Sequence, residues 1–193
     1  MLYLVRHGET SYNAEGRLQG QLDVPLNEKG VRQAKALGVW LKNRGMSFDA
    51  LYSSTLSRAG ETARLIGESL GMEPKAVPGL EEINFGRFQG HTFLECARLF
   101  PEEYADFLIR LAASNAHGGE TGREVMERAR KTVLSLPEAK EGTALVVTHG
   151  AVIGYLRGAV MGRDLTDIRD LIPRNAQLVE FDEKALEKLR NYK

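Results

Sequence analysis

Hydrophobic and polar residues follow two alternating patterns along the chain. Short apolar runs, typical of buried strands, occupy residues 1–5, 48–52, 144–147 and 178–181. Apolar residues recur at helical spacing over residues 28–44, 58–70, 91–113 with a break at Pro101, 123–136 and 151–160. Strands that alternate with helices pair in parallel, because each helix carries the chain back to the starting edge of the sheet.

The run at 144–147 is apolar throughout and lies between Gly142 and Gly150, as expected of a central strand covered on both faces. We therefore expect an α/β fold, a three-layer α/β/α sandwich in which a mostly parallel sheet carries helices on both faces. No repeat, low-complexity tract or linker divides the sequence. Residues 1–193 are expected to form a single domain.

Composition narrows the possible functions. The 193 residues include 26 Lys and Arg against 26 Asp and Glu, which excludes a globally basic nucleic-acid binder. The longest apolar run, residues 1–5, is too short for a membrane span or a signal peptide. We expect a cytoplasmic protein with no membrane or nucleic-acid partner. Cys96 is the single cysteine, and the four histidines form no zinc-like pattern, so no metal is expected.

Two histidines end strands in similar contexts. His7 ends the first strand in LYLVRHG, and His149 ends the late buried strand in LVVTHG. Active sites of parallel sheets gather outside the carboxyl ends of the strands. One such histidine is most often structural, but two at the same sheet edge, each followed by glycine, indicate a shared site.

Polar residues near this edge are suited to an anion. Arg6 precedes His7, and Arg58 lies in the first turn of a predicted helix, where a cation opposes the helix dipole unless an anion binds there. Such an arginine at a helix start is expected to contribute little to stability. Asn13 and Gln19 add neutral donors in the first loop.

Glu81 and Glu82 form an acidic pair between apolar residues, before a glycine-rich loop. Neighbours in an extended loop point in opposite directions, so at most one should enter the site. A bound phosphate would favour the protonated form of a nearby carboxyl, which could then act as a general acid.

Taken together, these segments resemble the histidine phosphatase superfamily, a phosphoglycerate mutase-like group with an RHG motif. The resemblance spans nearly the whole chain in order, through LVRHGETSYN, RLQGQLDVPLNEKGVRQA, LYSSTLSRAGETA, LEEINFGRFQG, GGETGREVMER, VVTHGAV and PRNAQL. It implies a small helical lid insertion at about residues 91–117. It also implies a metal-independent reaction without a cofactor.

The resemblance also implies roles for individual residues. His7 would become phosphohistidine, with Arg6, Arg58 and His149 around the phosphoryl group. Glu82 would be the proton donor, with Glu81 as its exposed neighbour. Asn13, the turn at Gln19 and Gly20, and Gly150 after His149 would complete the phosphate pocket.

Three functions fit this resemblance. The first is a histidine acid phosphatase-type phosphomonoesterase acting on a small phosphorylated metabolite, similar to the broad-specificity or α-ribazole phosphate phosphatases. The alternative is a cofactor-dependent phosphoglycerate mutase, and the third is an inactive module that binds a phosphorylated ligand. The oligomeric state is left open, with a homodimer among the options.

The expected lid favours the phosphatase. It carries two basic and four acidic residues, Arg98 and Arg110 against Glu95, Glu102, Glu103 and Asp106, which would repel a second phosphate. Ala151 stands where a polar residue is expected in a mutase. The lid aromatics, Phe93, Phe100, Tyr104 and Phe107, could stack on a leaving group, although their spacing fits a core better.

Overall fold

The computed structural model describes residues 1–109, 113, 115 and 117–192. Its sheet has five strands, β1 (Leu2–Arg6), β2 (Ala50–Ser53), β3 (Lys75–Ala76), β4 (Ala144–Thr148) and β5 (Leu178–Phe181). Its helices are α1 (Ser11–Glu15), α2 (Glu28–Asn43), α3 (Ser57–Leu70), α4 (Phe93–Leu99), α5 (Pro101–Ile109), α6 (Gly122–Ser135), α7 (Gly150–Met161) and α8 (Glu183–Asn191). Short 3-10 turns occupy Gly86–Phe88, Pro137–Ala139 and Arg169–Leu171.

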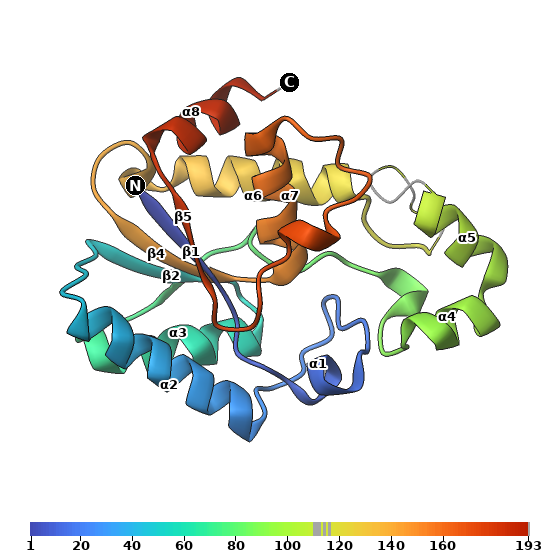
Figure 1. Ribbon diagram of the computed structural model, residues 1–193, viewed down its shortest axis with the longest axis horizontal. Coiled ribbons are helices and arrows are strands. Elements are labelled where there is room, and N and C mark those ends of the chain that lie inside the picture. The colour runs from blue at the N-terminus through green and yellow to red at the C-terminus, as the bar shows by residue number, and fades with distance from the viewer. Residues whose placement is uncertain (110–112, 114, 116, 193) are drawn as a thin grey trace.

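The strands lie in the order β3-β2-β4-β1-β5, with only β5 antiparallel to its neighbour. Helices α2 and α3 cover one face of the sheet, and α6, α7 and α8 cover the other (Figure 1). This confirms the α/β fold with a mostly parallel sheet and helices on both faces. No helix in the described part of the chain is long and apolar enough to cross a membrane.

Each face of the sheet has its own apolar core. Val5, Leu145 and Val147 point towards α2 and α3, whereas Leu4 and Val146 join the core beneath α6 and α7. The alternation follows from the strand period of two, because successive side chains point to opposite faces. Since β1 and β4 are buried on both sides, their carboxyl ends are held in fixed positions.

The sequence pattern did not predict helices α1 and α8 or strand β3. The loop after β1 contains α1, which begins at a reciprocal capping box between Thr10 and Asn13. Helix α8 follows β5 and packs against α6 and α7 through Leu186 and Leu189. Strand β3 has two exposed residues, too few for a periodic signal.

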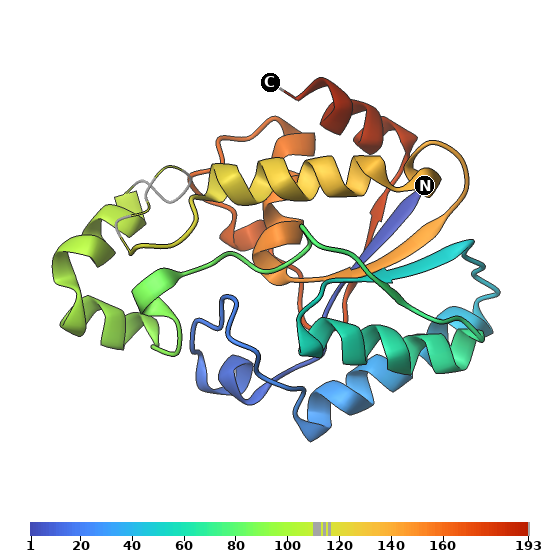
Figure 2. The ribbon, with the colours of Figure 1, turned by 180° about the vertical axis from the view of Figure 1, so that it is seen from behind.

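Helices α4 and α5 extend away from the sheet (Figures 1 and 2). The helix expected over residues 91–113 is divided here at Phe100, and Pro101 is the first residue of α5 because proline needs no donor at a helix start. Residues 110–112 of that expected helix, Arg110 among them, lie outside the described residues, and residue 113 lies in a turn.

A close backbone contact sets the position of the segment after β1. A Cβ added to Gly8 would lie 2.5 Å from the carbonyl oxygen of Gly30 in α2, and one added to Gly30 would lie 2.1 Å from the Glu9 carbonyl oxygen. Glycine is therefore required on both sides. The first turn of α2 thus packs directly against the residues that follow His7.

We expect Gly30→Ala to lower the free energy of unfolding by about 1–3 kcal/mol, because backbone atoms cannot move aside as a side chain can. Gly60→Ala is the matched control, since Gly60 is also helical and its added methyl meets no atom within 4 Å. It should raise stability by about 0.5–1 kcal/mol. Urea unfolding measures both, and equal effects would contradict the close-contact argument.

Candidate active site

His7 and His149 meet at the carboxyl edge of the sheet. Their ring centroids are 5.2 Å apart, and both side chains are buried. The two residues follow the neighbouring parallel strands β1 and β4, which pair in register from Leu2 with Ala144 to Arg6 with Thr148. Strand pairing therefore brings together two histidines that are 142 positions apart in the sequence.

His7 has one ring nitrogen engaged by its own loop. Nδ1 lies 2.7 Å from the carbonyl oxygen of Gly8, so Nδ1 carries the proton and donates it there. Nε2 then keeps its lone pair, and Arg58 Nε donates to it at 3.3 Å. Burial, followed by the charges of Arg58 and Arg6, holds the pKa of His7 well below its usual range. His7 is therefore neutral at pH 7, with Nε2 suited to nucleophilic attack.

His149 is held through its other nitrogen. Nε2 lies 2.8 Å from Ser54 Oγ, an oxygen that already accepts from the Leu56 backbone N–H. The Ser54 hydroxyl can then donate to Nε2, which places the His149 proton on Nδ1. That nitrogen is buried and has no protein partner among the described residues. Burial lowers the pKa of His149 well below its usual range, with the Arg58 charge as the next cause.

Arg58 is fully buried, with no exposed surface. Its two terminal nitrogens donate to the backbone oxygens of Leu22 and Gly20, at 2.8 and 2.7 Å. Gly20 thus positions Arg58, and its φ of +53° explains the glycine at that turn. The low contribution to stability expected for Arg58 does not fit this position, because its removal would leave two carbonyls without a donor.

Arg6 lies beside the same two histidines. Its NH1 donates to the Pro173 carbonyl oxygen, while its Nε is buried without a partner among the described residues. Gly150, the first residue of α7, leaves room for this guanidinium, because a Cβ there would lie 3.2 Å from Arg6 Nε. Burial lowers the pKa of Arg6, and the Glu82 carboxylate opposes that shift.

Asn13 and Gln19 both lie in the loop after β1, where Thr10 connects them. Thr10 Oγ1 donates to Gln19 Oε1 at 2.8 Å, and the Thr10 backbone N–H donates to Asn13 Oδ1. Asn175 also donates to Asn13 Oδ1 and to the His7 carbonyl oxygen. Because their oxygens accept these bonds, both amides turn their nitrogens, the donor ends, away from Thr10.

The two glutamates diverge, as the sequence indicates. Glu81 accepts from the Thr55 hydroxyl and from the Gly79 backbone N–H. Glu82 accepts from Ile83 N at 3.0 Å and from Ala151 N, in the first turn of α7, at 3.3 Å. The Glu82 carboxylate also raises the pKa values of Arg6 and Arg58 against the effect of burial, so it shares their electrostatic environment.

Sequence reasoning missed the residues that hold these groups in place. Thr62 Oγ1 accepts from Gly8 N and donates to the Arg58 carbonyl oxygen. Arg128 donates to the carbonyl oxygens of Gly79, Glu81 and Glu82, and forms a two-point ion pair with Glu120. Their only signal was membership of the motifs that contain Arg58 and Glu120.

The arrangement fits a tetrahedral oxyanion. Among the described residues, Arg6 Nε and His149 Nδ1 are buried and have no hydrogen-bond partner, and both residues are close to His7. Buried donors of this kind need an acceptor, which phosphate oxygens would supply. Within the described residues, no group of three or more His, Cys, Asp or Glu side chains could hold a metal ion.

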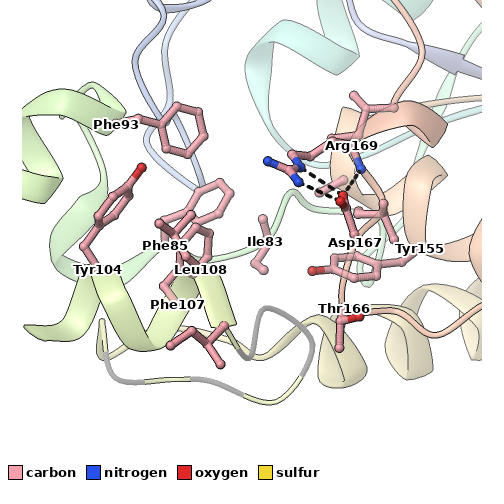
Figure 3. Close-up of a pocket in the computed structure, with 14 residues that line it drawn as sticks. Ile83, Phe85, Phe93, Tyr104, Phe107, Leu108, Tyr155, Thr166, Asp167 and Arg169 are labelled. Carbon is pink, nitrogen blue, oxygen red and sulfur yellow. Dashed lines mark hydrogen bonds and ion pairs between the residues drawn. The ribbon is translucent and has the colours of Figure 1, made fainter.

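A cavity of about 530 Å³ adjoins this site (Figure 3). Phe85, Phe93, Tyr104 and Phe107 line one side, and residues from α7 and the segment 166–172 line the other. The histidines and the arginines Arg6 and Arg58 do not line it. The cavity is therefore separate from these four residues. It comes close to Glu82, because Ile83, which follows Glu82, and Ala151, which donates to Glu82, are both lining residues.

Two histidines and two arginines gather at one buried point of this α/β fold, an arrangement suited to a phosphoryl group. The sequence matches the histidine phosphatase superfamily (branch 1) over residues 2–188, so the chain belongs to that family. It is 33% identical over 186 residues to the probable phosphoglycerate mutase GpmB of Escherichia fergusonii, covering 94% of this chain and 84% of that protein.

Solved structures of phosphatases share the fold. A putative α-ribazole-5′-P phosphatase from Escherichia coli has a TM-score of 0.83 at 26% identity, covering 95% of this chain and 91% of that one. A mycobacterial glucosyl-3-phosphoglycerate phosphatase has a TM-score of 0.77 at 32% identity, covering 92% and 90%. The related proteins thus include one named as a probable mutase and others named as phosphatases.

The low pKa of His7 predicts how stability depends on pH. Below a pH of about 6.5, the unfolded chain binds a proton at His7 that the folded protein excludes, so the free energy of unfolding falls as the pH falls. His7→Gln should reduce this slope by up to about 1.4 kcal/mol per pH unit. Urea unfolding between pH 7.5 and 5.5 measures it, and identical slopes would contradict burial of neutral His7.

Proposed function

We propose that this protein is a phosphomonoesterase that hydrolyses a small phosphorylated metabolite through a phosphohistidine on His7. The observation that carries the proposal is the neutral imidazole of His7, whose unprotonated Nε2 contacts the Arg58 guanidinium, in a site where Arg6 Nε and His149 Nδ1 are buried without partners among the described residues. An unprotonated nucleophile beside fixed positive charge is what phosphoryl transfer requires.

In the first step, His7 Nε2 attacks phosphorus and the bond to the leaving oxygen breaks. Arg6, Arg58 and His149 stabilise the charge on the equatorial oxygens. Glu82 gives its proton to the leaving oxygen and so releases an alcohol.

In the second step, the Glu82 carboxylate takes a proton from water, whose oxygen attacks the phosphohistidine. The nitrogen–phosphorus bond breaks, inorganic phosphate leaves and His7 returns to its neutral form. Asn13, Gln19, Gly20 and Gly150 support the phosphate pocket, by donor amides in the first two cases and by backbone position in the others. No metal or cofactor has a role in either step.

The charges around the cavity favour a phosphatase over a mutase. The acidic lid turns out to be partly neutralised, because Glu95 pairs with Arg17 and Glu103 pairs with Arg87. Repulsion by four carboxylates is therefore a weaker argument against the mutase than the sequence indicated. The cavity lining gives a stronger argument against the mutase. Arg169 is the one cation among the described lining residues, and two hydrogen bonds hold it to Asp167. A second phosphate would lack a cation to bind it.

We expect His7→Ala to abolish phosphate release from an aryl phosphate, since the alanine offers no nucleophile. Wild-type protein quenched in alkali after brief exposure to a ³²P-labelled aryl phosphate should carry acid-labile label on His7. Mapping of the labelled peptide checks this, and label on His149 would reverse the two roles. Binding of the aryl phosphate without any turnover would instead support the inactive binding module.

The mutase alternative is tested with 3-phosphoglycerate and a priming amount of 2,3-bisphosphoglycerate, in protein dialysed against EDTA. Release of inorganic phosphate should exceed formation of 2-phosphoglycerate, because water reaches the phosphohistidine and the second phosphate is weakly held. Phosphorus NMR follows both products. Fast isomerisation with little free phosphate would make the mutase the better function, and activity restored only by a divalent ion would contradict the metal-free mechanism.

A further inference from the structure

Figure 3 shows two walls that face each other across the cavity beside Glu82. Aromatic and aliphatic side chains of α4, α5 and the 83–85 segment form one wall, including Phe93, Tyr104 and Leu108. Tyr155 of α7 and the residues Thr166, Asp167 and Arg169 form the other. The volume of about 530 Å³ falls within the range of small-molecule sites.

From this cavity we infer that the leaving group of the substrate is an uncharged, apolar alcohol that carries a ring, and that it binds between α4–α5 and the 166–172 segment. The inference rests on the proposed function, whose substrate class it specifies. In the proposed mechanism the ester oxygen of a phosphate at His7 faces Glu82, and Glu82 is adjacent to Ile83 and bonded to Ala151, which both line the cavity. The alcohol would therefore enter the cavity.

The charge of the lining excludes an anionic leaving group. Asp167 and Arg169 are its only charged members among the described residues, and they bind each other through Nε to Oδ1 at 2.9 Å and NH2 to Oδ2 at 2.6 Å. Both are half or more exposed, which places them at the mouth. A carboxylate deeper in the cavity would lose its hydration without gaining a cation.

Three apolar side chains of the lining lack cover. Phe93 is 50% exposed, Leu108 is 52% exposed and Ile109 is 75% exposed. Phe107 is buried, and Phe100 does not line the cavity. The aromatic residues of the expected lid therefore fall into two groups, one packed in a core and one exposed to the cavity. Phe107 and Tyr104 pack against Phe88 in a small core, as their spacing indicated, and Phe93 stays open to the cavity. An apolar ligand would cover the surfaces that the fold leaves exposed.

The test compares phenyl phosphate, 2-naphthyl phosphate and 4-carboxyphenyl phosphate, whose phenols have similar acidity. We expect kcat/KM to be at least about tenfold higher for 2-naphthyl than for phenyl phosphate, and at least about tenfold lower for 4-carboxyphenyl phosphate. Equal values for the three substrates, or a preference for the carboxylate, would overturn the inference.

Matched variants locate the effect. Leu108→Ala should lower kcat/KM for 2-naphthyl phosphate about three- to tenfold, mainly through KM, because it removes apolar contact area. Leu99→Ala is the control, since Leu99 is similarly exposed at 48% but does not line the cavity. Equal effects of the two variants would place the leaving group elsewhere.

Asp167→Asn tests the charge argument. It frees the Arg169 guanidinium and should reduce severalfold the ratio of kcat/KM for phenyl phosphate to kcat/KM for 4-carboxyphenyl phosphate. Unchanged discrimination would contradict the role assigned to the ion pair.

Binding separates failure of this inference from failure of the proposed function. His7→Gln should bind 2-naphthyl phosphate more tightly than phenyl phosphate in isothermal titration calorimetry, whether or not the wild type turns over. If no substrate releases phosphate but this order of affinity holds, the proposed function fails and the apolar site stands. If phosphate is released but the affinities are equal, the proposed function stands and the inference fails.

Discussion

The buried guanidinium of Arg58 is the constraint around which the candidate site is organised. A charge out of contact with water is costly unless its donors are satisfied, and the loop after α1 meets that need with the carbonyl oxygens of Gly20 and Leu22. Its Nε donates to His7 Nε2. Burial lowers the pKa of His7 most, and the Arg58 charge that the loop stabilises lowers it further, so folding of the loop and the neutral state of this imidazole are linked.

The rest of the site divides between rigid strands and a network of loop contacts. Strand pairing fixes the backbone positions of His7 and His149, because each follows a strand, β1 or β4, that is buried on both faces. Hydrogen bonds set the directions of their rings: His7 contacts the Gly8 carbonyl oxygen and Arg58 Nε, and His149 contacts Ser54 Oγ. Arg128 holds the loop that carries Glu82. Its guanidinium donates to three carbonyl oxygens of that loop.

The candidate phosphate site and the neighbouring cavity differ in polarity and in burial. The first is polar, buried and rich in donors, which suits a group common to every phosphate ester. The second is mostly apolar and is built from α4, α5 and the 166–172 segment, outside the sheet. Glu82 is bonded to Ala151 and precedes Ile83, two residues of the cavity lining. Under the proposed function, substitutions in the cavity would alter the accepted alcohol without disturbing the phosphoryl chemistry. The related phosphatases carry names with different substrates.

The sequence by itself determined the sheet and the residues at its edge. Apolar runs such as 144–147 carry the strand period directly, and a histidine that follows such a run must lie at the carboxyl end of its strand. Short elements such as α1 and β3 carry too few residues for a period. Only the tertiary structure decided that Arg58 is buried, that Arg128 holds the Glu82 segment, and that Glu95 and Glu103 are paired. Those outcomes depend on contacts between residues far apart in the chain, and no local pattern encodes which distant side chain will satisfy a buried charge.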